Sequence, residues 1–272
     1  MKRFSESRYI NSCSFLKKYN DNIYKLITMK CSLKVSGYEE NRKNSENRKK
    51  NGEKLEKLEN NIIRTRSKIL EYALCNEFEY FVTLTLDSKK MERDNIDAYI
   101  KKLSQYIRDI RKQTGQKIEY LLIPERHKDG TNWHMHGLFR GLKDLRKYDI
   151  NENIPKRMKN KIKKYREENL SLYEWTGYSK RFGFSCIEPV RDKMAVSRYI
   201  TKYISKNIDG DMGITQINKK KYYSSRGLKT AKTLKKGVIN VEGIKYDFEN
   251  DYSKVKWLNA EQAKEIEKLF NS

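Results

Sequence analysis

The amino-acid sequence predicts an α+β domain in which helices are interspersed among the strands of an antiparallel sheet. Apolar residues recur with helical spacing in three segments, residues 53–76, 95–115 and 193–208. Short apolar or alternating segments typical of strands lie at residues 79–87, 117–124, 133–141 and 182–190. Residues 129–132, "DGTN", predict a turn that joins two of these strands as a hairpin.

Several residues indicate where these elements end and which way they face. Gly115 is expected to end the second helix. Asp192 is expected to cap the N-terminus of the third helix, which should end before Gly210. The strand "EYFVTLTLD" should have two different faces, with Val82, Leu84 and Leu86 on one and Phe81, Thr83 and Thr85 on the other.

The rest of the chain is expected to contain fewer regular elements. The charged insert at 142–170 should be partly helical, "KKKYYSS" at 219–225 a last strand, and 259–270 an exposed helix. Residues 37–52 are polar and charged without periodicity, as in a flexible linker. The expected division is a basic N-terminal arm and linker at 1–52, a folded domain at 53–235, and a C-terminal tail with a helix at 236–272.

Basic residues greatly outnumber acidic ones, with 60 Lys and Arg against 36 Asp and Glu and a net charge of +24. This excess indicates a polyanionic partner, either nucleic acid or an anionic membrane. The apolar runs are far shorter than the roughly 20 residues that a membrane span needs, and the N-terminus lacks the apolar core of a signal peptide. We therefore expect a cytoplasmic protein that binds nucleic acid and no membrane.

Two common kinds of site are not predicted. The four cysteines, Cys13, Cys31, Cys75 and Cys186, are scattered without a CxxC pair, which supports neither a disulfide framework nor a zinc ribbon. The sequence contains no GxxxxGK[ST] motif, so an ATP-driven helicase module is not expected in it.

The three histidines are concentrated in one part of the chain. In the strand "WHMHGLFRG", His134 and His136 should point to the same face, about 6.5–7 Å apart. Glu125, at the end of the neighbouring strand, can supply a third ligand. Two imidazoles and a carboxylate suit a catalytic Mn²⁺, Mg²⁺ or Zn²⁺ ion, although such a pair is also typical of a polar surface. His127 could be a fourth ligand, a phosphate contact or a turn residue, and we favour a role other than metal binding.

A second group of reactive side chains lies in "YITKYISK", residues 199–206. Helical spacing places Tyr199, Lys202, Tyr203 and Lys206 within one arc, beside an apolar stripe formed by Val196, Ile200 and Ile204. A phenol has an ordinary pKa of about 10, so as a nucleophile it needs help from nearby cations or a metal. Tyrosines at this spacing also occur in simple packing.

In this order, "FVTLTLD", "PERHKDGTNWHMHG" and "YITKYISK" resemble the three motifs of HUH-type rolling-circle replication initiators. The doubled YxxK is similar to that of the two-tyrosine initiators of small single-stranded DNA phages. The resemblance covers about residues 64–230. It implies the HUH endonuclease fold, with a central antiparallel sheet of about five strands, a metal site on its central strands, and the tyrosine helix lying across it.

The resemblance also implies an activity, the nicking and rejoining of single-stranded DNA at a specific site through a 5′-phosphotyrosyl intermediate. The implied roles are nucleophile for Tyr199 and Tyr203, metal ligand for His134 and His136, and, at a position that varies in the family, third ligand for Glu125. Lys202 and Lys206 could stabilise phosphate charge or assist proton transfer. The metal would be Mn²⁺ or Mg²⁺, with Zn²⁺ as a further option.

Such a reaction would start rolling-circle replication of a plasmid, phage or integrative element, together with a host helicase and polymerase. A conjugative relaxase and a single-strand transposase would use the same chemistry. A different class stays open, a non-catalytic DNA-binding replication or regulatory protein whose histidines are structural. The oligomeric state is not predicted.

Further DNA contacts are expected in the basic runs "KRMKNKIKKYR" (156–166) and "NKKKYYSSRGLKTAKTLKK" (218–236). Basic residues interleaved with aromatic ones suit single-strand binding by charge and stacking. The candidate contacts are Thr83, Thr85, His127, Tyr222, Tyr223 and Arg226. For the two threonines, simple strand propensity is an alternative explanation.

Overall fold

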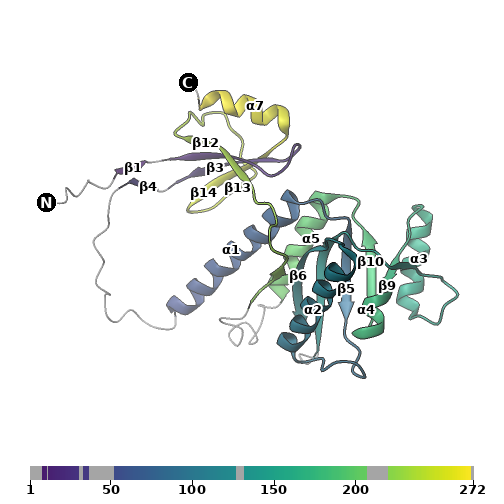
Figure 1. Cartoon of the computed structure of the whole chain (residues 1–272). Helices are drawn as coiled ribbons and strands as arrows, with labels where there is room; N and C mark the ends of the chain where they lie inside the picture. Colours follow the sequence, from purple (N-terminus) through teal and green to yellow (C-terminus); the bar gives the residue numbers. More distant parts are fainter. Residues whose placement is uncertain are drawn as a thin grey trace. The chain divides into compact units, whose positions relative to one another are not determined.

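The structure confirms the α+β class, because its sheets are antiparallel and helices pack on them. It is a computed structural model that describes residues 8–10, 12–30, 33–36, 52–126, 132–206 and 220–270. The chain forms two units (Figure 1), one consisting of Leu58–Leu228 and the other of Met1–Lys57 together with Lys229–Ser272.

The larger unit, Leu58–Leu228, is built on a seven-stranded antiparallel sheet in the order β11-β6-β7-β5-β10-β9-β8. The expected strands form its centre, with β5 at Tyr80–Thr85, β6 at Glu119–Arg126, β7 at Trp133–Arg140 and β10 at Ser185–Pro189. The expected last strand is β11 (Tyr223–Ser224). The sheet exceeds the expected five strands because β8 (Leu145–Lys147) and β9 (Tyr173–Trp175) extend it, and these are too short to show a periodic pattern.

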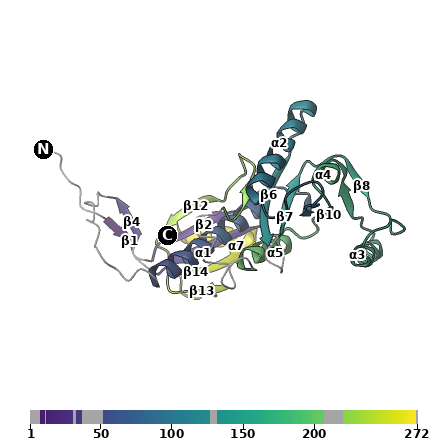
Figure 2. The ribbon, with the colours of Figure 1, turned by 90° about the horizontal axis from the view of Figure 1, so that it is seen from below.

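The helices of this unit lie on both faces of the sheet, and Figure 2 shows α2 and α5 on opposite sides of it. They are α1 (Gly52–Cys75, most of which belongs to this unit), α2 (Ile96–Thr114), α3 (Lys156–Glu167), α4 (Thr176–Arg181) and α5 (Lys193–Lys206). α3 is the helix expected within the charged insert. Among the described residues, no helix combines the length and the apolar composition needed to cross a membrane.

Local signals in the sequence set the ends of the two helices on opposite faces. Asn95 caps α2, where its side chain accepts a hydrogen bond from the Ala98 N–H at 3.0 Å. Gly115 ends α2 in the left-handed conformation, with φ of 68°, as expected. Asp192 is confirmed as the cap of α5, since its Oδ1 accepts from the Ala195 N–H at 2.9 Å.

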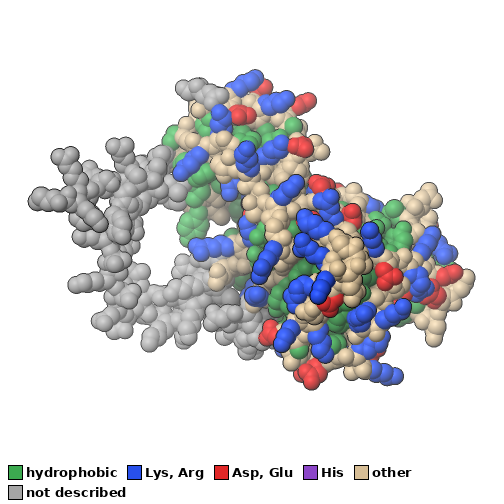
Figure 3. Space-filling view, viewed as in Figure 1, with side chains coloured by type: hydrophobic (Ala, Val, Ile, Leu, Met, Phe, Trp, Pro, Cys, Tyr) green, Lys and Arg blue, Asp and Glu red, His purple; other side chains and the backbone are tan. Residues whose placement is uncertain are grey.

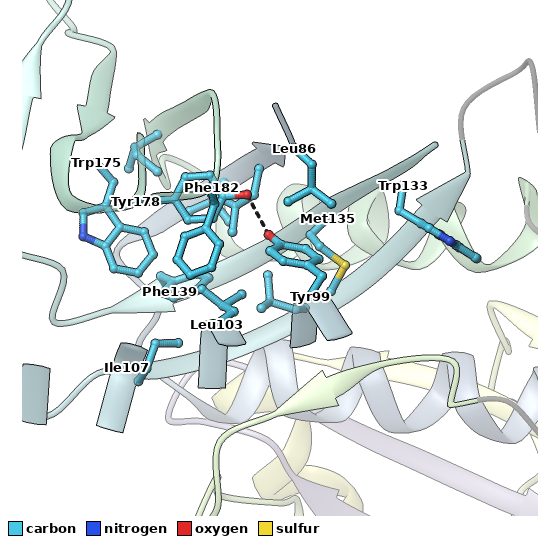
Figure 4. Close-up of a cluster of buried hydrophobic side chains, with 14 of the residues drawn as sticks. Leu86, Tyr99, Leu103, Ile107, Trp133, Met135, Phe139, Trp175, Tyr178 and Phe182 are labelled. Carbon is cyan, nitrogen blue, oxygen red and sulfur yellow. Dashed lines mark hydrogen bonds between the residues drawn. The ribbon is translucent and has the colours of Figure 1, made fainter. Parts of the chain in front are cut away.

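The central strands bury residues on both faces, because neighbours along a strand point in opposite directions. On the α2 side the core includes Val82, Leu84 and Met135 and the aromatic residues labelled in Figure 4. Within it, the hydroxyls of Tyr99 and Tyr178 form a hydrogen bond at 2.7 Å. Each buried phenol therefore has a polar partner, which is worth about 1 kcal/mol to stability.

The other face of the sheet packs against α1 and α5. Its core consists of Phe81, Leu121, Ile123 and Leu138 from the strands, with Ile69, Ala73, Ile200, Tyr203 and Ile204 from the two helices. Ile200 and Ile204 form the apolar stripe that was expected to dock the tyrosine helix, and both are almost fully buried. This second face is the one on which the candidate site lies.

The smaller unit joins strands from both ends of the chain in a five-stranded antiparallel sheet, in the order β12-β2-β3-β14-β13. The strands are β2 (Ser14–Lys18), β3 (Tyr24–Met29), β12 (Lys232–Gly237), β13 (Phe248–Glu249) and β14 (Ser253–Leu258). β1 (Arg8–Ile10) and β4 (Leu33–Ser36) form a separate two-stranded sheet. α7 (Ala260–Leu269) begins at a capping box between Asn259 and Gln262.

This organisation differs from the sequence-based division into an N-terminal arm and a C-terminal tail. β2 pairs with β12, and β3 pairs with β14, so the two chain ends share one sheet. These pairings join residues far apart in the sequence, which no local pattern can indicate. The helix expected at 259–270 is present, but one side of it is buried, with Ala263 and Ile266 packed in the core of this unit.

Gly137, directly after the histidine pair, should tolerate no side chain. A Cβ at this position would lie 2.5 Å from the Leu121 carbonyl oxygen and 2.6 Å from Leu122 Cδ2, so β6 and β7 would have to separate. We expect Gly137→Ala to lower the free energy of unfolding by about 1–3 kcal/mol, measured by urea denaturation with circular dichroism. Gly237→Ala is the control, since its Cβ would meet only Phe270 Cδ1 at 3.7 Å. Equal losses in both variants would contradict this explanation.

Candidate functional site

The register of the three central strands gathers polar side chains on one face of the larger sheet. β7 lies between β5 and β6, and His134 is opposite Thr85 on one side and Glu125 on the other. His136 is opposite Thr83. Directly opposed residues share a face, so these side chains form two adjacent rows on the face that α5 contacts.

His136 is held at both of its ring nitrogens. Its Nδ1 lies 3.2 Å from Thr83 Oγ1, and its Nε2 lies 2.7 Å from Glu125 Oε2. Glu125 reaches this nitrogen by leaning along the sheet, because its own register partner is His134. His136 is only 9% exposed, so both polar atoms have partners where water has little access.

The second histidine is held in the same way from β5. His134 Nδ1 lies 2.9 Å from Thr85 Oγ1. In both pairs the threonine hydroxyl engages Nδ1, which makes Nε2 the nitrogen that can coordinate an ion. A hydrogen bond at one ring nitrogen fixes the orientation of the imidazole, an arrangement common in metal-binding histidines. Thr83 and Thr85 thus contact the histidines, and their expected contact with DNA stays a prediction.

Helix α5 brings the two tyrosines to the histidines. The Tyr203 ring stacks on the His136 ring, with centroids 3.9 Å apart and planes 10° apart. The Tyr203 hydroxyl donates a hydrogen bond to the Tyr199 hydroxyl at 2.7 Å. The two phenols differ sharply in exposure, since Tyr203 is 5% exposed and Tyr199 is 47% exposed.

The surroundings of Tyr203 favour its neutral form. Burial raises the pKa of the Tyr203 phenol well above its ordinary value, and the hydrogen bond to Tyr199 raises this pKa further. The negative charges of Glu125 and Glu188 act in the same direction. Tyr203 is therefore a hydrogen-bond donor in this cluster rather than a ready phenolate.

Two residues of the cluster were not identified from the sequence. The Phe81 ring stacks near His136 at 6.1 Å and meets Tyr199 edge-on at 5.5 Å. Its alternation with Thr83 and Thr85 was the available signal. Glu188 lies opposite Phe81 on β10 and accepts hydrogen bonds from Lys161 Nζ at 2.6 Å and Tyr165 Oη at 2.5 Å. No sequence pattern distinguishes Glu188 from the other acidic residues.

The histidine cluster has donor atoms suited to a divalent ion. Metal–ligand distances of about 2.0–2.2 Å are compatible with the 2.7 Å between His136 Nε2 and Glu125 Oε2. His134 is in the adjacent row on the same face. Over the described residues, which leave out 127–131, no group of three or more His, Cys, Asp and Glu side chains is arranged to hold a metal ion. The donor set fits the expected ion through the pair in contact, with His134 beside it.

The other expected site residues are more dispersed. Lys202 is exposed on α5, whereas His127 and the side chain of Lys206 lie outside the described residues. Tyr222 packs on the α5 side of the sheet, with its ring 6.2 Å from that of Tyr72, while Tyr223 packs on the α2 side. Arg226 is exposed. The structure therefore separates Tyr222 from Tyr223, which the sequence analysis had grouped together.

Comparison with known protein families gives one match. Residues 79–208 match the ORF2 family of replication-associated proteins. The matched segment contains β5, β6, β7 and α5, and with them all the residues of the histidine–tyrosine cluster. The match supports a role in the initiation of DNA replication. No curated protein and no solved structure matches the chain.

The two threonines of β5 should control the two histidine rings independently. We expect Thr85→Val to shift the ring ¹⁵N signals of His134 and to leave those of His136 unchanged, and Thr83→Val to do the converse. Thr→Ser at either position should restore the signals, because serine keeps the hydroxyl. Long-range ¹H–¹⁵N spectra can measure this, since the chain has only three histidines. Unaltered signals in both valine variants would contradict the hydrogen bonds.

Proposed function

We propose that the protein is a site-specific HUH-type endonuclease that cuts one DNA strand, holds its 5′ end on a tyrosine, and later rejoins it. The observation that carries the proposal is the stacking of Tyr203 on His136, with Tyr199 hydrogen-bonded to Tyr203. Potential nucleophiles thus lie beside the potential metal ligands, although the two groups are distant in sequence. The resemblance of the three motifs and the match to replication-associated proteins support the same conclusion.

The proposed reaction is a transesterification. Tyr199 Oη attacks the phosphorus of one phosphodiester, the bond from phosphorus to O3′ breaks, and a 5′-phosphotyrosyl ester forms. The phenol loses its proton as the new bond forms, and the departing 3′ oxygen gains one, so bonds and protons balance. One phosphate ester replaces another, so the reverse reaction can rejoin the strand without ATP.

His136, Glu125 and His134 are the residues that would hold a divalent ion, for which Mn²⁺ and Mg²⁺ are the first candidates and Zn²⁺ a further one. A bound ion would supply positive charge beside the phosphate oxygens, where negative charge develops during attack. Thr83 and Thr85 hold the imidazoles in the orientation that presents Nε2. Phe81 packs against His136 and Tyr199 and so limits how far either ring can turn.

The difference in exposure between the two tyrosines suggests a division of roles. Tyr199 can reach a phosphate directly, because nearly half of it is exposed. Tyr203 stays neutral and donates a hydrogen bond to Tyr199 Oη, which stabilises negative charge on that oxygen. We therefore assign the first attack to Tyr199. Once Tyr199 is esterified, Tyr203 is the remaining phenol of the pair for a second transfer.

The charge of the protein favours a DNA strand as substrate. The net charge is +24, and Figure 3 shows Lys and Arg side chains spread over the visible face. Lys202 is exposed one helical turn from Tyr199 and can pair with a phosphate close to the attacked one. The free 3′-OH is a primer for a polymerase, and a helicase would separate the strands. Rolling-circle replication of a plasmid, phage or integrative element is the proposed setting.

Loss of the Tyr199 hydroxyl should abolish covalent attachment to DNA. We expect Tyr199→Phe to give no SDS-resistant adduct with a labelled single-stranded origin oligonucleotide and Mn²⁺. Tyr203→Phe should still form the adduct, about tenfold more slowly, because it loses one hydrogen bond to the nucleophile. The adduct would be measured by denaturing gel electrophoresis over time.

The reverse pattern, with an adduct in Tyr199→Phe and none in Tyr203→Phe, would contradict the assigned order. Tight binding without any adduct, across candidate origins and metals, would instead favour a non-catalytic DNA-binding protein. The double variant Tyr199→Phe/Tyr203→Phe is the blank for both experiments.

Cleavage and DNA binding should separate at the histidine strand. We expect His136→Ala to abolish cleavage and to leave the salt-dependent affinity for single-stranded DNA within about twofold, since phosphate contacts by Lys and Arg dominate that affinity. Fluorescence anisotropy at several salt concentrations measures the binding. Met135→Leu is the matched control, because Met135 lies on the opposite face of the same strand and should retain cleavage. Equal loss of binding and cleavage in His136→Ala would mean that the histidine serves the fold.

A further inference from the structure

The smaller unit has a sheet face that the proposed nicking site does not use. α7 packs on the face that carries Leu16, Leu26 and Leu258. Neighbours along a strand point to opposite faces, so the intervening residues lie on the other side of the sheet. Prominent among them are three aromatic residues and three lysines, Phe15, Trp257, Phe248, Lys17, Lys25 and Lys236.

These side chains form two rows across the strands. In one row Lys236 is opposite Phe15, with its Nζ 5.6 Å from the centre of the ring. In the other row Lys17, Lys25 and Trp257 follow one another, and Lys25 Nζ lies 5.0 Å from the Trp257 ring. Each of these two rings therefore has an ammonium group beside it, an arrangement suited to a ligand with both flat rings and negative charge.

The composition of this face also limits what can bind it. Phe248, at the end of the first row, is 57% exposed, and Phe15 and Trp257 are partly exposed. At the paired strand positions of this face, as far as the structure describes them, no acidic residue occurs. A second copy of the chain, packed face to face about a two-fold axis, would bring its own lysines against these lysines. A polyanion complements the face in charge.

We propose that this face, named here the Phe15–Trp257 face, binds single-stranded DNA. Bases stack on exposed aromatic rings whatever the sequence, and lysines between the rings pair with the phosphates. In a duplex the flat sides of the bases are covered by their neighbours, so a single strand fits and a duplex does not. This site is separate from the histidine–tyrosine cluster and does not depend on the nicking proposal.

Trp257 provides a direct reporter for this site. Of the three tryptophans, Trp133 and Trp175 are 3% and 1% exposed, so a base can stack only on Trp257. We expect an oligothymidine without an origin sequence to quench tryptophan emission of the full-length Tyr199→Phe protein saturably. Trp257→Phe in that background should abolish the quenching, and a duplex of equal length should produce little. Saturated binding with unchanged emission would overturn the proposal, whether or not the wild-type protein nicks DNA.

The lysines can be tested against a control set in the same unit. Lys17→Gln/Lys25→Gln/Lys236→Gln should lower the slope of log affinity against log salt by about 2, from about 0.7 per phosphate contact on a single strand. The control removes three exposed charges elsewhere in the unit, Lys232→Gln/Lys245→Gln/Lys264→Gln. Its slope should change less.

Equal changes in both triple variants would overturn the proposal, since any surface lysine would then serve. A change of oligomeric state in the first variant, with unaltered DNA binding, would assign the face to a second copy of the chain and overturn it as well. The fluorescence experiment stands even where a triple variant folds poorly.

Discussion

The antiparallel register of β5, β7 and β6 is the constraint on which the candidate site depends. It sets Thr85, His134 and Glu125 in one row and places Thr83 and His136 in the next. A slip of one residue in either pairing would turn a whole set of side chains to the opposite face. The buried alternation on the α2 side opposes such a slip, because it would move Val82 and Leu84 out of their core. The apolar core thus holds the polar site in place.

The second requirement is the docking of α5 on that face. Ile200 and Ile204 are buried against the sheet, and their burial fixes the rotation of the helix. With this rotation Tyr203 falls on the His136 ring, and Tyr199, one turn earlier, points further into solvent. One hydrophobic stripe therefore determines which phenol is accessible. The proposed division of roles between the tyrosines follows from packing rather than from any difference in their chemistry.

Much of this arrangement could be predicted from the sequence where the signal is local. The alternation around Thr83 and Thr85, the cap at Asp192 and the Ile200–Ile204 stripe identified the elements and their faces. The contact of Glu125 with His136, rather than with its register partner His134, depends on side-chain rotamers that no spacing reveals. Glu188 reaches the cluster through the pairing of β10 with β5, which the sequence does not encode locally. The smaller unit was missed as a sheet because β2 pairs with β12 at the other end of the chain.

The central claim is that Tyr199 forms the covalent bond to DNA. Its most direct test is tandem mass spectrometry of the adduct after digestion with trypsin and a nuclease. Trypsin cuts after Arg198 and Lys202, so Tyr199 and Tyr203 fall in different peptides, 199–202 and 203–206. The account predicts a nucleotide phosphate on Tyr199 in the first peptide after a single round of cleavage. A nucleotide on Tyr203 alone, or cleaved DNA without any modified peptide, would contradict it.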